Sequence, residues 1–408
     1  MSFQNGLSGL NAAAQNLDVI GNNVANVNTV GAKASRAQFA DVYANSIYGQ
    51  GAVASGMGVT VSSVDQQFTQ GAISASDNPL DMAINGSGFF RLSRNGAVSY
   101  SRNGEFRLDK DSYLVTSDGA RLTGYGADAN GTVLVGMPQE LRLSSANIAP
   151  QATTEGEIQM NLDSRIVALT TPFSATDPAS YSGATTLSVF DQQGNANQLT
   201  TFYRKVGDNS WEVYGAANGS PITGGGPNGS LTTLTFNPDG SLSAPSTPVA
   251  ITVPTSGSAG GSQTMSLDLT GVTQFGTTFS VTAQTQNGFA PGEIAGFSIA
   301  KDGTVMANYT NGETKAQGQV VLANFSNPQG LAPMGGNAWA ETADSGQPVV
   351  GIPTSGALGA LKSGALESSN IDLTEELVNM ITAQRSYQAN AQTIKTQDQI
   401  LQTIVNLR

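Results

Sequence analysis

The chain has 408 residues, a formal net charge of −12, only 12% charged residues, and neither cysteine nor histidine. The missing residue types exclude disulfide frameworks, thiolate or imidazole zinc sites, and Ser-His-Asp or Cys-His nucleophile systems. The acidic balance, without a lysine or arginine cluster, argues against nucleic-acid binding through phosphate contacts. No apolar run reaches the ~18 residues of a membrane span. The opening MSFQNGLSGL also lacks the basic and apolar regions of a secretory signal peptide. We therefore expect no nucleic-acid partner, no membrane insertion and no cleaved leader.

A helix is predicted over residues 2–28, because apolar residues recur there at alternating steps of four and three. The members of this seam are Phe3, Leu7, Leu10, Ala14, Leu17, Gly21 and Val24. The spacing fits a coiled-coil edge and an ordinary amphipathic helix equally well. Glycines inside the helix each cost about 1 kcal/mol relative to alanine, so we expect the helix to need a partner surface.

An asparagine-rich stretch, GNNVANVNTVGAKAS at 21–35, follows this helix and carries one charge, on Lys33. Asn22, Asn23 and Asn26 can end a helix and form hydrogen bonds with the nearby backbone. Burying an uncharged amide also costs less desolvation free energy than burying the charged side chain of Lys or Glu. The stretch is therefore predicted to be buried between subunits of an assembly.

A longer helix is predicted at the other end of the chain. It starts near Asp372, and Glu375 three residues later resembles a capping box. Its roughly 36 residues contain no Gly or Pro and would span on the order of 55 Å. Its seam runs through Leu373, Leu377, Met380, Gln384, Tyr387, Ala391, Ile394, Asp398, Leu401 and Val405. A second stripe of isoleucines widens the apolar face, so neighbouring copies of the chain are expected to cover what the first helix does not.

Between the helices the sequence predicts β structure. Asn-Gly and Asp-Gly pairs recur between short runs rich in Val, Leu, Tyr and Phe, which is typical of hairpins. The pairs stand at 95–96, 103–104, 118–119, 130–131, 218–219, 228–229, 239–240, 287–288, 302–303 and 311–312. Loop-like composition near 145–155 and 283–292 bounds an insert with nine acidic and three basic residues. We interpret the insert as a separate, solvent-facing β domain.

The predicted fold is mixed and mainly β, with the terminal helices forming a coiled-coil-like stem and two nested β-rich domains between them. The length suits two to three domains. The predicted parts are a terminal helical domain (1–30 with 370–408), a connecting segment (31–72 with 355–369), a β domain (73–147 with 284–354) and an inserted outer β domain (148–283).

Few residues suggest chemistry. NGSGFF at 85–90 contains Gly-x-Gly, but a strand rather than a helix follows, which favours a tight turn over a nucleotide loop. Asp109, Asp111 and Asp118 provide too few oxygens at alternate positions for a calcium loop. Glu155 and Glu157 can share a strand face, as glycosidase carboxylates do, but nothing aromatic surrounds them. We expect a protein that is not an enzyme, with no catalytic, cofactor or metal site.

Several stretches resemble a known family. NLDVIGNNVANVNTVGAKAS (16–35) is similar to the N-terminal signature of the bacterial flagellar axial proteins, which form rod, hook and hook-associated structures. NPLDMAINGSGFFRL (78–92) and SYSRNGEFRLD (99–109) resemble their second shared block. The end of the chain, from 376, resembles their C-terminal helix, and KTQDQIL within it is similar to hook proteins in particular.

Two more stretches, TQNGFAPGEIAGFSIAKDGTV (285–305) and GQVVLANFSNPQGLAPMGGNAW (318–339), also resemble hook proteins. One departure is Ala32, where the family usually has an aromatic residue after Gly31, so the packing of this position is open.

The resemblance implies a structural subunit of the flagellar hook, which polymerises with itself into a curved tube. That tube would act as a flexible universal joint transmitting torque from rod to filament. The resemblance also implies an extracellular location and export through the flagellar type III apparatus without a cleaved signal peptide. Implied partners are a hook cap during assembly, the distal rod and hook–filament junction proteins, and a hook-length control protein.

On this interpretation the helical seams and the asparagines form the assembly interface. Its residues are Phe3, Leu7, Leu10, Leu17, Asn22, Asn23, Val24, Asn26, Leu377, Met380, Tyr387, Ile394, Leu401 and Val405. The alternatives are a distal rod or hook-associated axial protein and, more remotely, a secreted adhesive or carbohydrate-active β protein. The large insert favours the hook over the distal rod.

Overall fold

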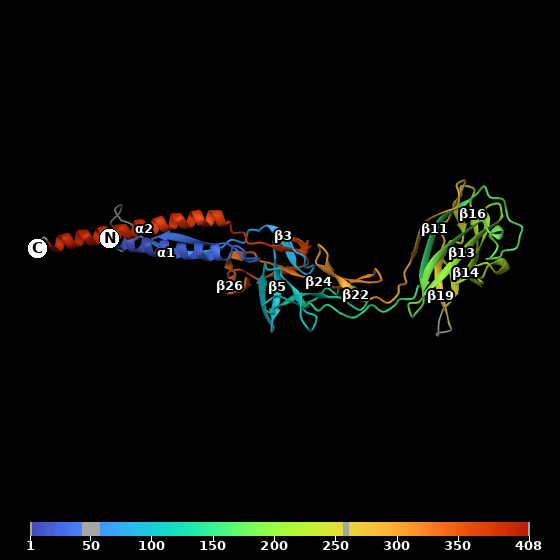
Figure 1. Ribbon diagram of the computed structural model, residues 1–408, viewed down its shortest axis with the longest axis horizontal. Helices are drawn as coiled ribbons and strands as arrows, with labels where there is room; N and C mark the ends of the chain where they lie inside the picture. Colours follow the sequence, from blue (N-terminus) through green and yellow to red (C-terminus); the bar gives the residue numbers. More distant parts are fainter. Residues whose placement is uncertain (1, 43–57, 256–260, 407–408) are drawn as a thin grey trace. The chain divides into compact units, whose positions relative to one another are not determined.

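The computed structural model describes residues 2–42, 58–255 and 261–406. The chain divides into two compact units, both drawn in Figure 1. Unit 1 comprises Met1–Ser145, Gly296–Asn308 and Thr314–Arg408, and unit 2 comprises Ala146–Ala295 and Tyr309–Glu313. Helices stand near both ends of the chain and strands make up most of the rest, which confirms the predicted mixed, mainly β fold.

Unit 1 contains both helices, α1 (Ser2–Ala25) and α2 (Leu373–Asn406). The helices lie side by side, and the two chain ends lie at the same end of the pair (Figure 1). Asp372 caps α2, because its Oδ1 accepts hydrogen bonds from the backbone N–H of Thr374 and of Glu375. A two-stranded antiparallel hairpin of β1 (Ser35–Asp41) and β2 (Val59–Gln66) packs along α1.

The remaining strands of unit 1 form one large sheet and two short pairs. The large sheet has the central order β22-β23-β24-β9-β5-β6-β27-β26. Its strands are β5 (Phe89–Arg94), β6 (Ala97–Ser101), β7 (Arg107–Leu108), β8 (Leu114–Val115), β9 (Arg121–Gly126), β10 (Gln139–Glu140), β22 (Ile294–Ile299), β23 (Thr304–Tyr309), β24 (Thr314–Val320), β25 (Leu322–Asn324), β26 (Ala332–Gly335), β27 (Ala338–Ala340) and β28 (Val349–Gly351). The short pairs are β3 (Ile73–Ala75) with β30 (Ala365–Glu367), and β4 (Met82–Asn85) with β29 (Ala360–Ser363).

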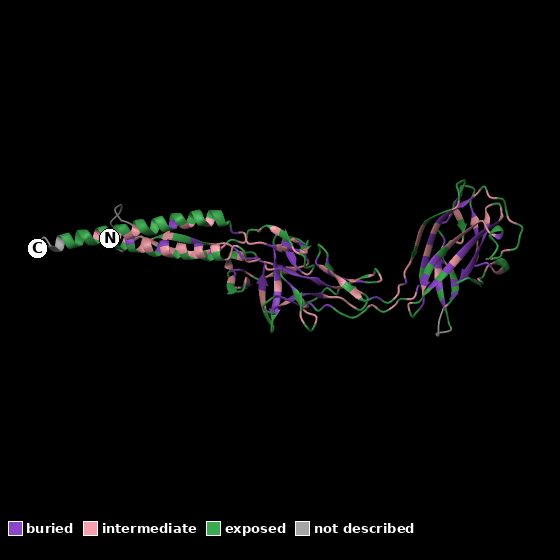
Figure 2. Ribbon diagram, in the orientation of Figure 1, coloured by how far each residue is buried: buried purple, intermediate pink, exposed green. Residues whose placement is uncertain are grey.

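Two apolar clusters form the core of unit 1. One is built around Phe90, Phe106 and Leu122, and the other around Phe89 and Trp339. Figure 2 shows the contrast between these buried strands and α2, which is exposed over most of its length. The helices therefore contribute little to the core of unit 1, and the sheet contributes most of it.

Unit 2 is a sandwich of two sheets over one core that contains Trp211 and Tyr203. One sheet has the central order β18-β19-β11-β20, and the other has β12-β13-β14-β16-β17. The strands are β11 (Glu155–Asp163), β12 (Gly183–Phe190), β13 (Ala196–Gly207), β14 (Ser210–Ala217), β15 (Ser220–Ile222), β16 (Thr232–Phe236), β17 (Leu242–Ala244), β18 (Val249–Pro254), β19 (Ser262–Asp268), β20 (Thr273–Phe275) and β21 (Ser280–Gln286).

The Asn-Gly and Asp-Gly pairs form turns at several of the predicted places. Asn95 and Gly96 both have positive φ between β5 and β6, as a type I′ turn requires. The pairs at 118–119, 218–219, 302–303 and 311–312 likewise join paired strands. The prediction is wrong at 103–104, 228–229 and 287–288, which do not join hairpin strands. At 103–104 a Cβ on Gly104 would lie 1.6 Å from the Met82 carbonyl oxygen, so this glycine serves close backbone packing.

Neither helix has the length and apolar character needed to cross a bilayer, within the part of the chain that the structure describes.

Candidate assembly surface

The two helices pair in opposite directions. Near the start of α1, Gly9 lies against Asn390 of α2. Near its end, Asn23 donates from Nδ2 to Oε1 of Glu376 over 3.0 Å. A Cβ at Gly9 would come within 2.9 Å of the Asn390 side chain, so glycine permits this close approach. A helix that looks weak by propensity therefore gains its partner within the same chain.

The face of α1 that its own chain buries is lined by small and polar residues together with Ile20. Its buried members include Gly6, Ala13, Ile20 and Asn23. Each of these buried residues stands one position before a residue of the predicted apolar seam. The seam is therefore rotated by about 100° around the helix from the buried face. Phe3 is 45% exposed and Leu7 44%, whereas Leu10, Leu17 and Val24 are half-buried. Phe3 and Leu7 therefore remain available to other surfaces, and Leu10, Leu17 and Val24 remain available in part.

The predicted seam of α2 also remains partly open. Leu377 is 44% exposed, Leu401 54% and Tyr387 37%, whereas Met380 and Ile394 are half-buried. The side chain of Val405 lies outside the described residues. Four further exposed apolar residues of α2 were not among the predicted interface residues: Leu373, Val378, Ile381 and Ile400, at 43%, 58%, 51% and 48%. Contiguous exposed apolar side chains mark interaction sites, so these residues belong to the candidate surface.

The asparagines divide between two environments. Asn23 is 4% exposed, and it donates to the Ser35 carbonyl (2.8 Å) and accepts from the Ser35 N–H (2.9 Å). Its amide joins α1 to β1 and α2 of the same chain, and its contact with other subunits stays a prediction. Asn22 is exposed and accepts at Oδ1 from Asn26 Nδ2 over 2.6 Å. Whether Asn22 and Asn26 contact other subunits stays a prediction.

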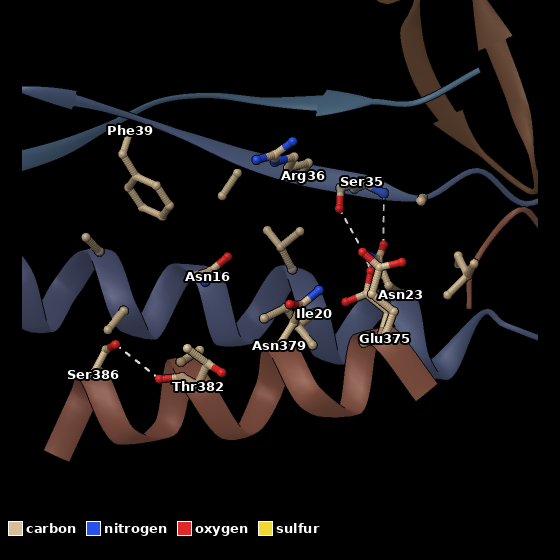
Figure 3. A pocket seen from close by; sticks show the side chains of 18 of the residues that line it. Asn16, Ile20, Asn23, Ser35, Arg36, Phe39, Glu375, Asn379, Thr382 and Ser386 are labelled. Atoms are coloured by element: carbon tan, nitrogen blue, oxygen red, sulfur yellow. Dashed lines mark hydrogen bonds between the residues drawn. The ribbon is translucent and has the colours of Figure 1, made fainter. Parts of the chain in front are cut away.

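A groove of about 760 Å³ runs between α1, α2 and the β1–β2 hairpin (Figure 3). Gly9, Ala12 and Ala13 lie on its α1 side, and polar, mostly uncharged side chains of α2 border it. Thr382 and Ser386 of α2 donate their hydroxyls to backbone carbonyls one turn earlier, so burial would leave neither hydroxyl without a partner. The uncharged part of the groove can therefore accept another surface at low desolvation cost, whereas its charged residues (Arg36, Asp372, Glu375 and Glu376) need partners on burial.

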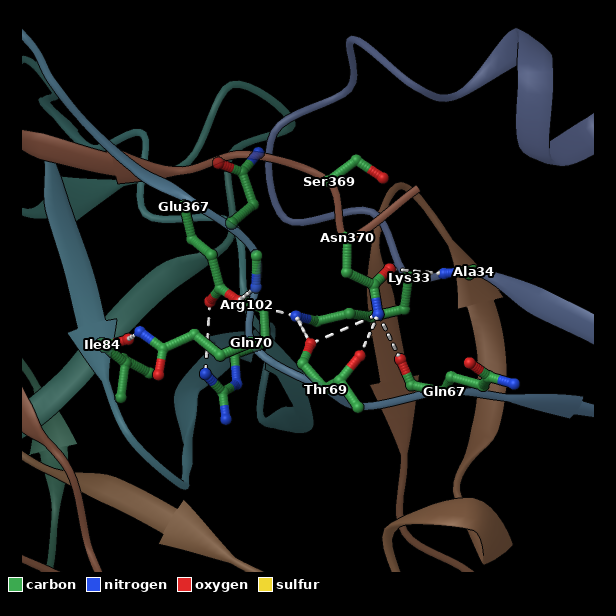
Figure 4. A network of polar contacts seen from close by, with 12 residues as sticks. Lys33, Ala34, Gln67, Thr69, Gln70, Ile84, Arg102, Glu367, Ser369 and Asn370 are labelled. Atoms are coloured by element: carbon green, nitrogen blue, oxygen red, sulfur yellow. Dashed lines mark hydrogen bonds and ion pairs between the residues drawn. The ribbon is translucent and has the colours of Figure 1, made fainter. Parts of the chain in front are cut away.

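A buried ionic network joins the chain segments that flank the two helices (Figure 4). Glu367, with a fully buried side chain, contacts Lys33 Nζ at 2.7 Å through Oε1 and Arg102 Nη1 at 3.2 Å through Oε2. Its Oε1 also accepts from the Gly71 N–H, while Lys33 donates to the Thr69 carbonyl. Burial lowers the pKa of Lys33, and the contact with Glu367 opposes that shift. Burial also lowers the pKa of Arg102.

This network was not predicted from the sequence. Its only signal was the single charge, on Lys33, in an otherwise uncharged stretch. The three side chains come from segments distant in sequence, so no local spacing connects them.

The turn at Gly31 positions Ala32. Gly31 has φ +70°, and a Cβ there would lie 2.6 Å from the Asn103 nitrogen, so another residue would be strained. Ala32 is 5% exposed and borders a cavity of about 160 Å³ that Asn26 and Trp339 also line. The short side chain at this position thus leaves space where a larger one would fit.

The residues weighed for chemistry have ordinary structural roles. Asp109 Oδ1 accepts from the backbone N–H of Asp111 and of Tyr113, as in a polar turn. Gly86 and Gly88 have positive φ in the turn between β4 and β5. Glu155 and Glu157 lie on β11, and Glu157 accepts from Gln159. No group of three or more Asp or Glu suited to a metal ion occurs among residues 2–42, 58–255 and 261–406.

Four family models match: Flagella basal body rod protein at 3–33, Flagellar hook protein FlgE/F/G D1 domain at 83–167, Flagellar basal body protein FlaE D2 domain at 161–289, and Flagellar basal body rod FlgEFG protein C-terminal at 362–407. The chain is 46% identical to the flagellar hook protein FlgE of Salmonella typhimurium over 413 residues, covering 100% of both chains.

The chain belongs to the flagellar hook protein FlgE family. FlgE of Escherichia coli K12 is 45% identical over 417 residues, again covering 100% of both chains. A crystal structure of Helicobacter pylori FlgE2 matches 72% of this chain and 100% of that chain with a TM-score of 0.53. Its identity is 13%, so it supports the fold alone. The family is one of structural proteins of the extracellular flagellar hook.

Proposed function

We propose that this chain polymerises through α1 and α2 into the curved tube of the hook. The tube bends as a universal joint while it transmits torque from rod to filament. The observation that carries the proposal is the set of large apolar side chains that the paired helices leave exposed, including Phe3, Leu7, Leu377 and Leu401. Burial of apolar surface contributes about 25 cal/mol per Å², so copies of the chain gain stability by covering these residues.

The low charge of the chain supports the bending part of the proposal. Only 12% of residues are charged, so Ser, Thr, Asn and Gly cover much of the surface. Such surfaces can slide past copies of themselves without breaking strong ion pairs. We infer that the terminal helical domain (1–30 with 370–408) forms the stiff tube wall. The β-rich parts, the insert 148–283 included, carry the sliding contacts.

Family membership supports a set of assembly partners. We infer export through the flagellar type III apparatus without a cleaved signal peptide, followed by assembly beneath a hook cap. The completed tube would contact distal rod proteins at one end and hook–filament junction proteins at the other, and a hook-length control protein would set its length.

Deletion of 1–28 or of 372–408 tests the assignment of assembly to the helices. Each truncated protein is expected to remain soluble and folded, because the sheet core of unit 1 lies outside the helices and the core of unit 2 is independent of them. Negative-stain microscopy of concentrated protein should give curved tubes for the full chain and none for the truncations. Straight tubes from the full chain would favour a rod protein. Tubes from either truncation would refute the assignment.

Point variants provide a matched control. Leu377→Gln combined with Leu401→Gln removes two exposed apolar side chains from α2 and should reduce the polymerised fraction. Val167→Gln removes one that is 81% exposed in unit 2 and should leave polymerisation nearly unchanged.

A further inference from the structure

The last turns of α2 lie beyond the reach of α1. Asn390 faces Gly9 of the antiparallel α1, which begins at Ser2, so α2 residues from about 398 onward have no α1 residue opposite them. Consistent with this register, every described residue from 398 to 403 is exposed, with Ile400 at 48% and Leu401 at 54%. We call 398–403 the overhang. Its two apolar residues have no cover within the described chain.

The groove between α1, α2 and the hairpin carries a charge pattern near its end at Asn23. Glu375 and Arg36 both line it. Asn23 is hydrogen-bonded to both Ser35 of β1 and Glu376 of α2, so these two residues lie at about the same level along the helix pair. From that level a strand advances about 3.3 Å per residue, whereas a helix advances about 1.5 Å. Arg36 therefore lies about level with residue 378 of α2, opposite Asn379 in Figure 3. Along α2, the groove thus presents three acids, Asp372, Glu375 and Glu376, and then, about three residues after Glu375, a base.

The end of α2 around the overhang carries the reverse order of charges, with the base before the acid. Lys395 is exposed, and the exposed Asp398 follows three residues later. Among the described residues, Arg36, Glu375, Lys395 and Asp398 take part in no ion pair. Two parallel α2 helices offset by 20 residues would place Lys395 beside Glu375 and Asp398 beside Arg36. The same offset brings Leu401 level with Ile381, which is 51% exposed.

We propose that the overhang of one subunit docks into the groove of a second copy of this chain, with the two α2 helices parallel and offset by 20 residues. The contact pairs Lys395 with Glu375 and Asp398 with Arg36, and Leu401 lies at its edge, about a quarter turn of the helix away. At about 1.5 Å per residue the stagger between the copies is about 30 Å along the stem. The inference rests on the proposed polymerisation and specifies which surfaces meet in it.

Charge reversal in the full chain tests the pairing. Arg36→Asp and Asp398→Arg each replace an attraction by a repulsion, and each should raise the critical concentration for tube formation roughly three- to tenfold. The double variant restores an opposite-charge pair and should return to within about twofold of the parent chain. Single variants that assemble normally, or a double variant no better than the singles, would overturn the proposal. Circular dichroism of the unassembled variants checks that they fold.

Disulfide trapping measures the offset directly, because the chain contains no cysteine. Thr382→Cys with Gln402→Cys places two thiols 20 residues apart on α2, about 30 Å along the helix. A disulfide needs Cα atoms within about 7 Å, so this pair can form one only between copies. Oxidised tubes should give a ladder of covalent multimers. Thr382→Cys with Thr393→Cys, offset by 11 residues, should give no ladder.

The outcomes separate the two proposals. Tubes of the first cysteine pair without a ladder would overturn the docking and leave polymerisation intact. A parent chain that forms no tubes would overturn both.

Discussion

Replacing Glu367 by Gln isolates the energetic role of the buried network. The side chains of Glu367 and Lys33 are fully buried, and that of Arg102 is 4% exposed. Glu367→Gln keeps the size of the side chain and one carbonyl oxygen, but it removes the negative charge that faces both cations. Two buried cations then remain without a counter-charge.

Breaking a buried ion pair by removing one partner costs about 3–5 kcal/mol, because the other charge stays desolvated. We expect a loss of this size in the free energy of unfolding of unit 1. For a domain of 150–250 residues each kcal/mol lowers the melting temperature by about 2–4 °C, so the transition of unit 1 should fall by about 10 °C. Asp118→Asn is the matched control. Its partner Arg94 lies 3.3 Å away and both side chains are about half exposed, so the expected loss is below about 1 kcal/mol.

The two tryptophans make the measurement specific. Trp339 lies in the core of unit 1 and Trp211 in that of unit 2, and the sequence contains no other. In a Trp211→Phe background, fluorescence during urea unfolding reports unit 1 alone. A loss below about 1 kcal/mol for Glu367→Gln would refute the reasoning, because the cations would then not depend on this carboxylate. Adding Lys33→Met should recover part of the loss, since one unpaired charge is removed.

Two further variants test single features. Ala32→Phe should fill the cavity beside Trp339 and stabilise unit 1 by about 1–2 kcal/mol. The control Ala365→Phe, at a fully buried site in β30, should overpack unit 1 and destabilise it. A lower free energy of unfolding for Ala32→Phe in urea would show that the larger side chain does not fit the cavity. Asp163 has its pKa lowered from 3.8 to about 2, chiefly by the hydrogen bond from Arg165. Its contribution to the stability of unit 2 is therefore present above about pH 3.8 and lost as the pH falls towards 2. Asp163→Asn should weaken the pH dependence of Trp211-detected melting between pH 4 and 2, and an unchanged profile would show that the carboxylate does not contribute.

The stem was predictable as secondary structure but not as an interface. Heptad spacing in both terminal segments fixes that each forms a helix with an apolar face. It does not say which face the other helix covers. In α1 the covered face contains Gly6, Gly9 and Ala13, because small residues allow closer approach than the neighbouring leucines. Which face that is depends on the shape of α2 and the hairpin, and neither is visible in the periodicity of α1.

Turn chemistry was predictable where it depends on the local backbone alone. Asn95 and Gly96 take the positive φ that a two-residue hairpin demands, and the sequence pair is enough to indicate it. Gly104 belongs to an identical Asn-Gly pair, yet it serves contact with the Met82 backbone. The same Asn-Gly dipeptide therefore has two structural roles, and which role it takes depends on the strand that packs beside it.

Periodicity, turn pairs and composition are local properties, and they were sufficient for two terminal helices, a β-rich middle and a chain suited to self-association. The network of Lys33, Arg102 and Glu367 required the folded chain, because 265 residues separate Arg102 from Glu367 and 334 separate Lys33 from it. The same holds for Asn23, which looks like a helix-ending surface residue and is buried between α1, β1 and α2. Pairing across such separations depends on how the sheets bring the segments together, and no spacing along the chain encodes that.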